Sequence, residues 1–178
     1  MNGYELPEVA QINGKTYKIR TDFRLMLKIL QYLDDGEKPL PLRWQVALQC
    51  FFVEPISPAE EAAAMEYMAK FLSGGRENEK PGPKLLDWQM DAPAIIAGVN
   101  RVAGMEVRSL ETLHWWTFLS FFHGIGEGQL SLLVGIREKL RKGQKLLPHE
   151  QDFYRQNRDW VNMQRPDPEK QRLNNLLQ

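Results

Sequence analysis

The stretch "LETLHWWTFLSFFHGIGEG", residues 110 to 128, constrains the fold of this chain more than any other feature. It places two tryptophans, three phenylalanines and two histidines in fewer than twenty positions. A helix that is apolar nearly all round its circumference is stable only when other elements enclose it. We therefore predict that residues 110 to 125 form a central helix, with Ser109 as its N-cap and the glycines of "HGIGEG" at its end.

The predicted central helix supplies most of the expected core. His114 is interpreted as a structural histidine, either satisfied by a hydrogen bond or partly exposed. The core side chains expected from this segment are Leu113, His114, Trp115, Trp116, Phe118 and Phe121.

A metal site is the sharpest alternative interpretation of the same segment. Glu111 and His114 form an E-x-x-H pair, the spacing that places a carboxylate and an imidazole on one helical face in di-iron bundles. Such a site needs a second E-x-x-H and two further glutamates, and the sequence has no second copy. Neither His114 nor His123 belongs to an H-E-x-x-H zinc motif. We therefore expect no metal, and a metal-dependent helical-bundle enzyme stays a remote alternative.

Other catalytic motifs are missing from the sequence. The glycines of "GIGEG" follow a predicted helix and lack the lysine and serine of a P-loop. No serine sits in a G-x-S-x-G elbow. The single cysteine, Cys50, lies in the apolar run "VALQCFFV" and is predicted to be a buried thiol. The expectation is a protein that is not an enzyme and needs no cofactor.

A β-hairpin is predicted at the N-terminus, over residues 9 to 20. Asn13-Gly14 lies between two short runs of β-forming residues in "VAQINGKTYKIRTDFR", and this pair readily adopts the positive φ angles of a type I′ turn. Thr21 is the expected cap of the amphipathic helix that follows and ends at Asp34-Asp35-Gly36. The apolar stripe of that helix is Phe23, Met26, Leu27, Leu30 and Leu33.

Apolar periodicity predicts the remaining elements, so the fold class is mainly α: a helical bundle of about six to seven helices with an N-terminal β-hairpin. We expect one helical domain over residues 1 to 165 and a flexible tail over 166 to 178. Residues 73 to 84, "SGGRENEKPGPK", hold glycines, prolines and charges and predict a surface loop. The other predicted helices run from 42 to 53 (largely enclosed), 58 to 72 (behind a Ser57 to Glu60 capping box), 91 to 104, 129 to 142 and 148 to 164.

Charge and hydropathy argue against two classes of partner. Lys+Arg and Asp+Glu both number 23, so no global positive field draws the chain onto nucleic acid or an anionic membrane. No apolar run approaches the ~18 residues that a membrane span requires. The N-terminus lacks the basic and apolar regions of a secretion signal. We expect a cytoplasmic protein that binds neither nucleic acid nor membrane.

The sequence resembles the phage protein family named after gene product fifteen, found in long-tailed phages and prophages. The run Leu113 to Trp116, with an aspartate-bearing helix before it and Ile136-Arg137 after it, is the most specific part of the resemblance. Residues 36 to 84 match little beyond helical patterning, and the C-terminal tail has no match. The segments that carry the resemblance are "INGKTYKIRTDFR" (12 to 24), "DWQMDAPAIIAGVNRVAGMEV" (87 to 107), "LETLHWWTFLSFFHGI" (110 to 125) and "IREKL" (136 to 140).

The resemblance implies a role in tail assembly and no enzymatic activity. Genes of this family typically lie between those for the major tail protein and the tape-measure protein. That position implies a chaperone, acting in the cytoplasm of the bacterial host, that binds the tape-measure protein or the tail-tube subunits non-covalently. A structural minor tail component that stays in the virion is the alternative, and self-association is a further expectation.

A chaperone of this kind acts through an exposed apolar groove or patch. Three tryptophans lie outside the aromatic cluster, and two methionines share one predicted helix; any of them that is exposed is a candidate anchor. For each methionine the competing interpretation is a gap-filler in the core. The candidate interface residues are Trp44, Trp88, Trp160, Met65 and Met68.

Overall fold

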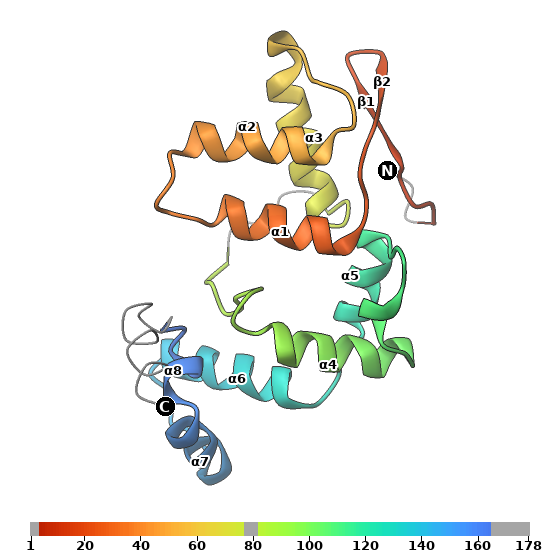
Figure 1. Ribbon diagram of the computed structural model, residues 1–178. Helices are drawn as coiled ribbons and strands as arrows, with labels where there is room; N and C mark the ends of the chain where they lie inside the picture. The colour runs from red at the N-terminus through yellow and green to blue at the C-terminus, as the bar shows by residue number, and fades with distance from the viewer. Residues whose placement is uncertain (1–3, 77–81, 165–178) are drawn as a thin grey trace, which may run out of the picture. The chain divides into compact units, whose positions relative to one another are not determined.

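The computed structural model describes residues 4–76 and 82–164 (Figure 1). The chain divides into two compact units: unit 1 comprises Met1–Gly82 and Val99–Gly124, and unit 2 comprises Pro83–Gly98 and Ile125–Gln178. The predicted flexible tail and part of the predicted surface loop lie outside the described residues. The one-domain organisation stays a prediction, and each unit is described below by itself.

The chain is mainly helical with an N-terminal hairpin, as the sequence predicts. Within the described residues there are eight α-helices, two short 3-10 helices and two strands. None of the helices in residues 4–76 and 82–164 is long and apolar enough to cross a bilayer. The helices are α1 (Phe23–Leu33), α2 (Leu40–Phe51), α3 (Glu61–Leu72), α4 (Ala92–Ala103), α5 (Trp115–His123), α6 (Gln129–Arg141), α7 (Pro148–Gln156) and α8 (Arg158–Val161), with 3-10 turns η1 (Pro58–Glu60) and η2 (Val107–Ser109).

The N-terminal hairpin is confirmed. Strands β1 (Val9–Ile12) and β2 (Lys15–Lys18) pair antiparallel. Asn13 and Gly14 have φ angles of 50° and 80°, as a type I′ turn requires. A bridge between Ile19 and Phe52 then joins the chain after the hairpin to the end of α2.

Several helix ends differ from the prediction. Asp22, not Thr21, caps α1, since its Oδ1 accepts the backbone N–H of Arg24 at 3.0 Å. The capping box before α3 is wrong: η1 takes its place, and the Ser57 hydroxyl donates to the Glu60 carboxylate. The helix predicted over 148 to 164 is two helices, α7 and α8, that meet at Asn157.

The aromatic segment is shorter as a helix than predicted. Residues 110 to 113 are not helical, Ser109 ends η2, and α5 begins at Trp115 with His114 as its N-cap. Trp115, Trp116 and Phe118 are buried, whereas Leu113, His114 and Phe121 are half-buried. An extended entry suits this position, because the backbone before α5 pairs with the chain before α1 through the bridge Asp22↔His114.

The core of unit 1 is built from stacked aromatic rings. Phe118 of α5 lies between Phe23 of α1 and Trp115, with ring centroids 4.7 and 5.6 Å apart. Phe51 of α2 packs against Phe71 of α3, with ring centroids 5.1 Å apart. Phe71 also lies near Trp116 of α5, with ring centroids 5.8 Å apart, so α1, α2, α3 and α5 surround one core.

Unit 2 has a smaller core around α6. Leu133, Ile136 and Val161 are buried, and half-buried hydrophobic side chains from α6, α7 and α8 pack against them. Gly98 allows the Ile125 side chain to approach α4 closely, because a Cβ added at Gly98 would lie 2.7 Å from Ile125 Cδ1. A larger residue at that position would push Ile125 away from α4.

Candidate functional site: a groove between α2 and α3

His114 has both ring nitrogens engaged in the fold. Its Nδ1 accepts the backbone N–H of Trp116 at 3.0 Å, and its Nε2 lies 3.1 Å from the Pro7 carbonyl oxygen. Since Nδ1 accepts, the proton of the neutral ring lies on Nε2 and is donated to Pro7. Burial lowers the pKa of His114 below its ordinary value, which favours this neutral form. His114 is therefore a structural N-cap.

The E-x-x-H metal alternative is wrong for this fold. Glu111 lies in an exposed, non-helical segment, so it does not share a helical face with His114. The imidazole nitrogens that would ligate a metal are already bonded to the backbone. Within the part of the chain that the structure describes, no group of three or more histidine, cysteine, aspartate or glutamate side chains is placed to hold a metal.

The tryptophan pair joins α5 to the C-terminal end of α3. The indole N–H of Trp115 donates to the Leu72 carbonyl, and that of Trp116 donates to the Phe71 carbonyl, both at 3.0 Å. The last carbonyls of a helix have no partner within the helix, so the Trp115 bond satisfies the Leu72 carbonyl, and the Trp116 bond adds a second donor to the Phe71 carbonyl, which also accepts the Gly74 backbone N–H. Gly75, with φ of +81°, leaves room for the Trp116 ring, because an added Cβ would lie 3.0 Å from it.

The "IRTDFR" segment also serves the fold. Arg20 donates to the Cys50 carbonyl at 3.0 Å, near the C-terminal end of α2. Arg24 pairs with Asp22 at 2.9 Å and donates to the Leu110 carbonyl. These arginines fix the entry to α1 against two other segments of unit 1.

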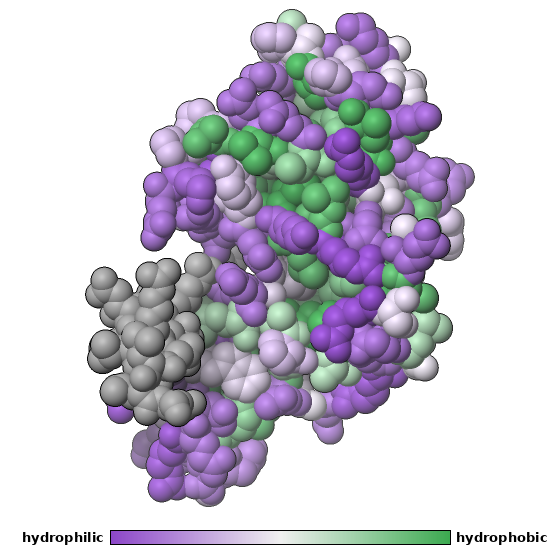
Figure 2. All heavy atoms as spheres, in the orientation of Figure 1, coloured by the Kyte–Doolittle hydropathy of each residue, from purple (hydrophilic) through white to green (hydrophobic). Residues whose placement is uncertain are grey.

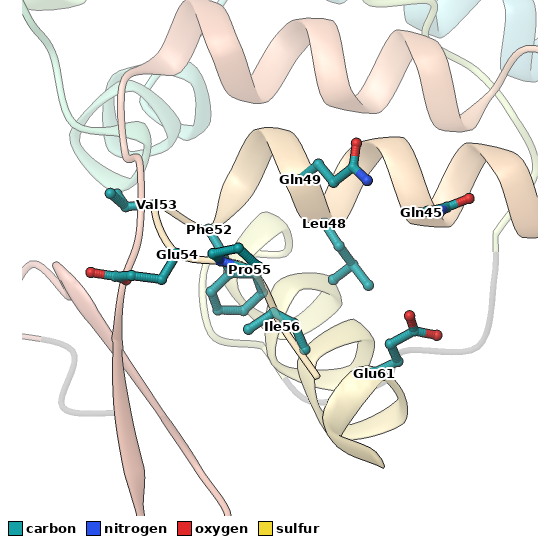
Figure 3. Close-up of a pocket in the computed structure, with 9 residues that line it drawn as sticks. All are labelled: Gln45, Leu48, Gln49, Phe52, Val53, Glu54, Pro55, Ile56 and Glu61. Carbon is teal, nitrogen blue, oxygen red and sulfur yellow. The ribbon is translucent and has the colours of Figure 1, made fainter. Parts of the chain in front are cut away.

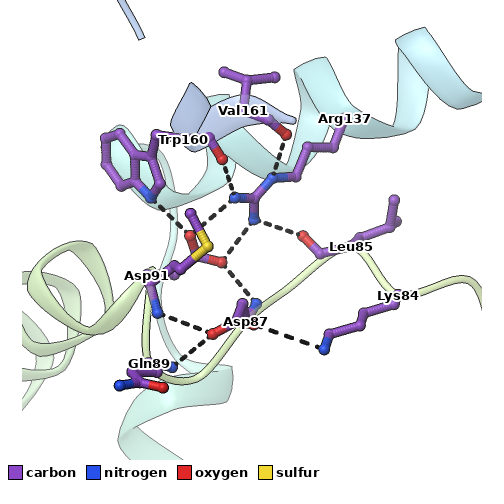
Figure 4. A network of polar contacts seen from close by, with 9 residues as sticks. Lys84, Leu85, Asp87, Gln89, Asp91, Arg137, Trp160 and Val161 are labelled. Atoms are coloured by element: carbon purple, nitrogen blue, oxygen red, sulfur yellow. Dashed lines mark hydrogen bonds and ion pairs between the residues drawn. The ribbon is translucent and has the colours of Figure 1, made fainter. Parts of the chain in front are cut away.

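A buried ionic network organises unit 2 (Figure 4). Arg137 of α6 and Asp91 at the start of α4 form two parallel bonds of 2.6 and 3.0 Å, and their side chains are only 3% and 0% exposed. The remaining guanidinium N–H groups donate to the backbone carbonyls of Leu85, Trp160 and Val161 at 2.7 to 3.0 Å. All five N–H donors of the guanidinium are thus used.

The carboxylate oxygens of Asp91 likewise accept several hydrogen bonds. Besides Arg137, it accepts the indole N–H of Trp160 and the backbone N–H of Asp87, each at 2.8 Å. The network therefore holds the segment before α4, helix α6 and the end of α8 together. Ile136-Arg137 and the aspartate-bearing helix of the family resemblance are fold determinants of unit 2.

The sequence-predicted interface residues are mostly built into the fold. Trp44, Trp88, Trp160 and Met65 are half-buried, and Trp160 uses its indole N–H inside the ionic network. Met68 is fully buried and packs in the core, so it is not available as an exposed anchor. Cys50, predicted to be buried, is half-buried.

A groove on unit 1 is the best candidate for a functional surface (Figure 3). Its volume is about 400 Å³, and it lies between α2, the segment after α2 and the first residue of α3. Leu48 and Phe52 form its buried floor, and Ile56 is half-buried beside them. The residues that line it are Gln45, Leu48, Gln49, Phe52, Val53, Glu54, Pro55, Ile56 and Glu61.

Helical spacing explains the groove. Gln45, Leu48 and Gln49 follow one another at i, i+3 and i+4, which places them on one side of α2, and Phe52 follows directly after the helix, where the backbone becomes extended. Leu42, 44% exposed, lies one turn earlier and extends this face. Figure 2 shows apolar side chains gathered over α1 and α2, bordered by hydrophilic side chains.

The rim of the groove is acidic. Glu54 and Glu61 are exposed and flank the apolar floor (Figure 3). The Glu54 carboxylate accepts the backbone N–H of Lys18 at 3.2 Å, which positions it. The neighbouring Glu60 is different, because it is buried and bonded to Ser57 and Tyr17, contacts that lower its pKa.

The sequence pattern did not indicate this groove. It predicted residues 42 to 53 to be largely enclosed, but Leu42, Gln45, Gln49 and Val53 are exposed. The available signal was the pair of glutamines at i and i+4 among apolar residues, which marks a solvent-facing side of the helix.

Comparison with known proteins assigns the family. Residues 4–163 match the model of the family described as Bacteriophage Gp15 protein. The chain belongs to this family. No curated protein and no solved structure shows a significant match to the chain. The family description names a bacteriophage protein and no reaction, so the function of this Gp15 protein has to be argued from its surface.

Proposed function

We propose that this Gp15 protein is a tail-assembly chaperone that binds the tape-measure protein, or tail-tube subunits, without covalent chemistry. The single observation that carries the proposal is the open groove with a buried apolar floor between α2 and α3, in a chain of a bacteriophage family. A groove with a buried apolar floor and a polar rim suits the apolar face of an amphipathic helix. A long helical protein presents such faces until a tube encloses it.

The groove is small compared with such a client. A volume of about 400 Å³ accommodates a few side chains, so one copy covers a short stretch of helix. Many copies along the client would mask it, and each would leave when tube subunits compete for the same face. Weak individual binding suits this role, since small interfaces are typical of transient complexes.

Co-expression tests the proposal. The full chain is produced in a bacterial host together with the tape-measure and major tail proteins of the same genome, and complexes are isolated through a tag on this chain. We expect the tape-measure protein to be recovered, and to be soluble only when this chain is present. If all three proteins are soluble and neither partner is recovered, the proposal fails.

Two variants make the test specific to the groove. Val53→Asp introduces a charge at a groove position that is 48% exposed, and Met105→Asp introduces the same charge at a position outside the groove that is 53% exposed. The proposal expects recovery of the client with Met105→Asp and loss of the client with Val53→Asp. Stoichiometric presence of the chain in purified tails would instead make it a virion component.

A further inference from the structure

The groove combines apolar contact area with two exposed glutamates at its rim. Among the nine described residues that line it, two are glutamates, two are glutamines and none is lysine or arginine. In Figure 3 Glu54 and Glu61 lie on opposite sides of the apolar residues. A ligand seated on the floor would therefore lie between the two glutamates.

Three cations of this part of unit 1 are engaged elsewhere. Lys15 pairs with Glu60 at 3.2 Å, and Arg20 donates to the carbonyls at the end of α2. Arg43 of α2 donates to the Leu33 carbonyl. These bonds direct the three cationic groups to partners other than Glu54 and Glu61, and Lys18 meets Glu54 through its backbone N–H.

We infer that the groove selects an amphipathic helix whose apolar stripe is flanked by lysine or arginine. This inference rests on the proposed function and specifies the chemistry of the client segment. The apolar floor takes side chains at i, i+3 or i+4 spacing, and the two rim carboxylates pair with cations beside the stripe. Charge complementarity of this kind governs which helix binds and how fast, more than how tightly any apolar stripe binds.

Direct binding of designed peptides tests the inference. Two synthetic helical peptides of about 20 residues, longer than the ~12–15 residues below which isolated helices are marginal, carry the same leucine stripe. One has lysines beside the stripe and the other has glutamates. Fluorescence anisotropy with the full chain is expected to show about tenfold tighter binding of the lysine peptide at low salt, because two exposed ion pairs replace two repulsive contacts. The preference should shrink at about 1 M salt, where the Debye length is about 3 Å.

The double variant Glu54→Gln/Glu61→Gln locates the effect. Glutamine keeps the size of the side chain and an oxygen that accepts the Lys18 N–H, so the groove keeps its shape while losing both charges. The preference for the lysine peptide is expected to disappear. Glu66→Gln is the matched control, since Glu66 is exposed on α3 and does not line the groove.

Several outcomes would overturn the inference. Equal affinities of the two peptides, binding of neither, or an undiminished preference in the double variant each contradict it. Dimerisation of the chain that the double variant alters would assign the groove to a second copy instead. Recovery of the tape-measure protein without peptide selection would refute this inference alone, whereas peptide selection without recovery would refute the chaperone role alone.

Discussion

The ionic network of unit 2 and the groove of unit 1 use polar residues in opposite ways. Arg137 and Asp91 are buried, and every N–H of the guanidinium has an acceptor. Glu54 and Glu61 stand exposed beside an apolar floor. The polar groups of the network bind one another within the fold, whereas the exposed glutamates of the groove can also bind a partner. The buried ionic network is therefore a structural feature, and the exposed groove is the functional candidate.

The largest expected effect comes from breaking the network. Asp91→Asn removes the charge that pairs with Arg137 and leaves a buried guanidinium uncompensated. Loss of one partner of a buried ion pair costs about 3–5 kcal/mol. Urea denaturation of the full chain, followed by circular dichroism, measures this loss. The control Asp159→Asn changes an exposed aspartate on α8, and the comparison fails if the two variants are equally stable.

A smaller effect is expected from the tryptophan pair of unit 1. Trp115→Phe removes the indole N–H that bonds the buried end of α3, and an unsatisfied buried carbonyl costs about 1–3 kcal/mol. Trp116→Phe should cost less, because the Phe71 carbonyl also accepts the Gly74 backbone N–H at 3.0 Å. Urea denaturation of both variants ranks them. Equal stabilities would show that the indole N–H of Trp115 is not what fixes α5.

The sequence predicted those parts of the fold whose secondary structure is determined by neighbouring residues in the chain. Asn13-Gly14 specified the hairpin, and apolar spacing specified α1, α4 and α6 close to their observed ends. The start of α5 was misplaced because the decisive contacts are long-range. Asp22 accepts the Leu113 N–H and the Trp115 N–H donates to the Thr21 carbonyl, so the chain before Trp115 is held extended by a segment about 90 residues away.

The candidate site was less accessible to sequence reasoning than the fold. Tryptophans outside the aromatic cluster were reasonable candidates for an interface. The structure shows, however, that the Trp160 indole N–H donates a hydrogen bond to Asp91. The groove combines one side of α2 with the turn before α3, and neither has a motif of its own. Spacing within α2 reveals a solvent-facing side, but the depth of a groove depends on tertiary packing.

A gradual effect is expected from pH through the N-cap of α5. Burial lowers the pKa of His114 below its ordinary value of 6.5, so the unfolded chain binds this proton more readily than the folded chain. The contribution of neutral His114 to the free energy of unfolding is therefore fully present above about pH 6.5, and it decreases as the pH drops below the pKa of the unfolded state. His114→Asn keeps a good capping residue and removes the titration. Denaturation between about pH 7.5 and 5 should show a shallower decline in the variant; since burial also lowers the pKa of His123, some decline should persist.

The smallest expected change in stability belongs to the groove, and it is the most informative one. Val53 is 48% exposed, and its backbone N–H, which donates to the Lys18 carbonyl, is unaffected by the side chain. Val53→Asp should therefore alter the free energy of unfolding by no more than about 0.5 kcal/mol, in contrast to Asp91→Asn. Because Val53 lines the groove, a bound leucine stripe would desolvate the new carboxylate, so binding of the lysine-bearing peptide should weaken markedly. If Val53→Asp unfolded the chain, the groove would be part of the core, and the contrast between a closed network and an open surface would be lost. A stable variant that no longer binds the peptide would show that stability and recognition reside in different regions of this Gp15 protein.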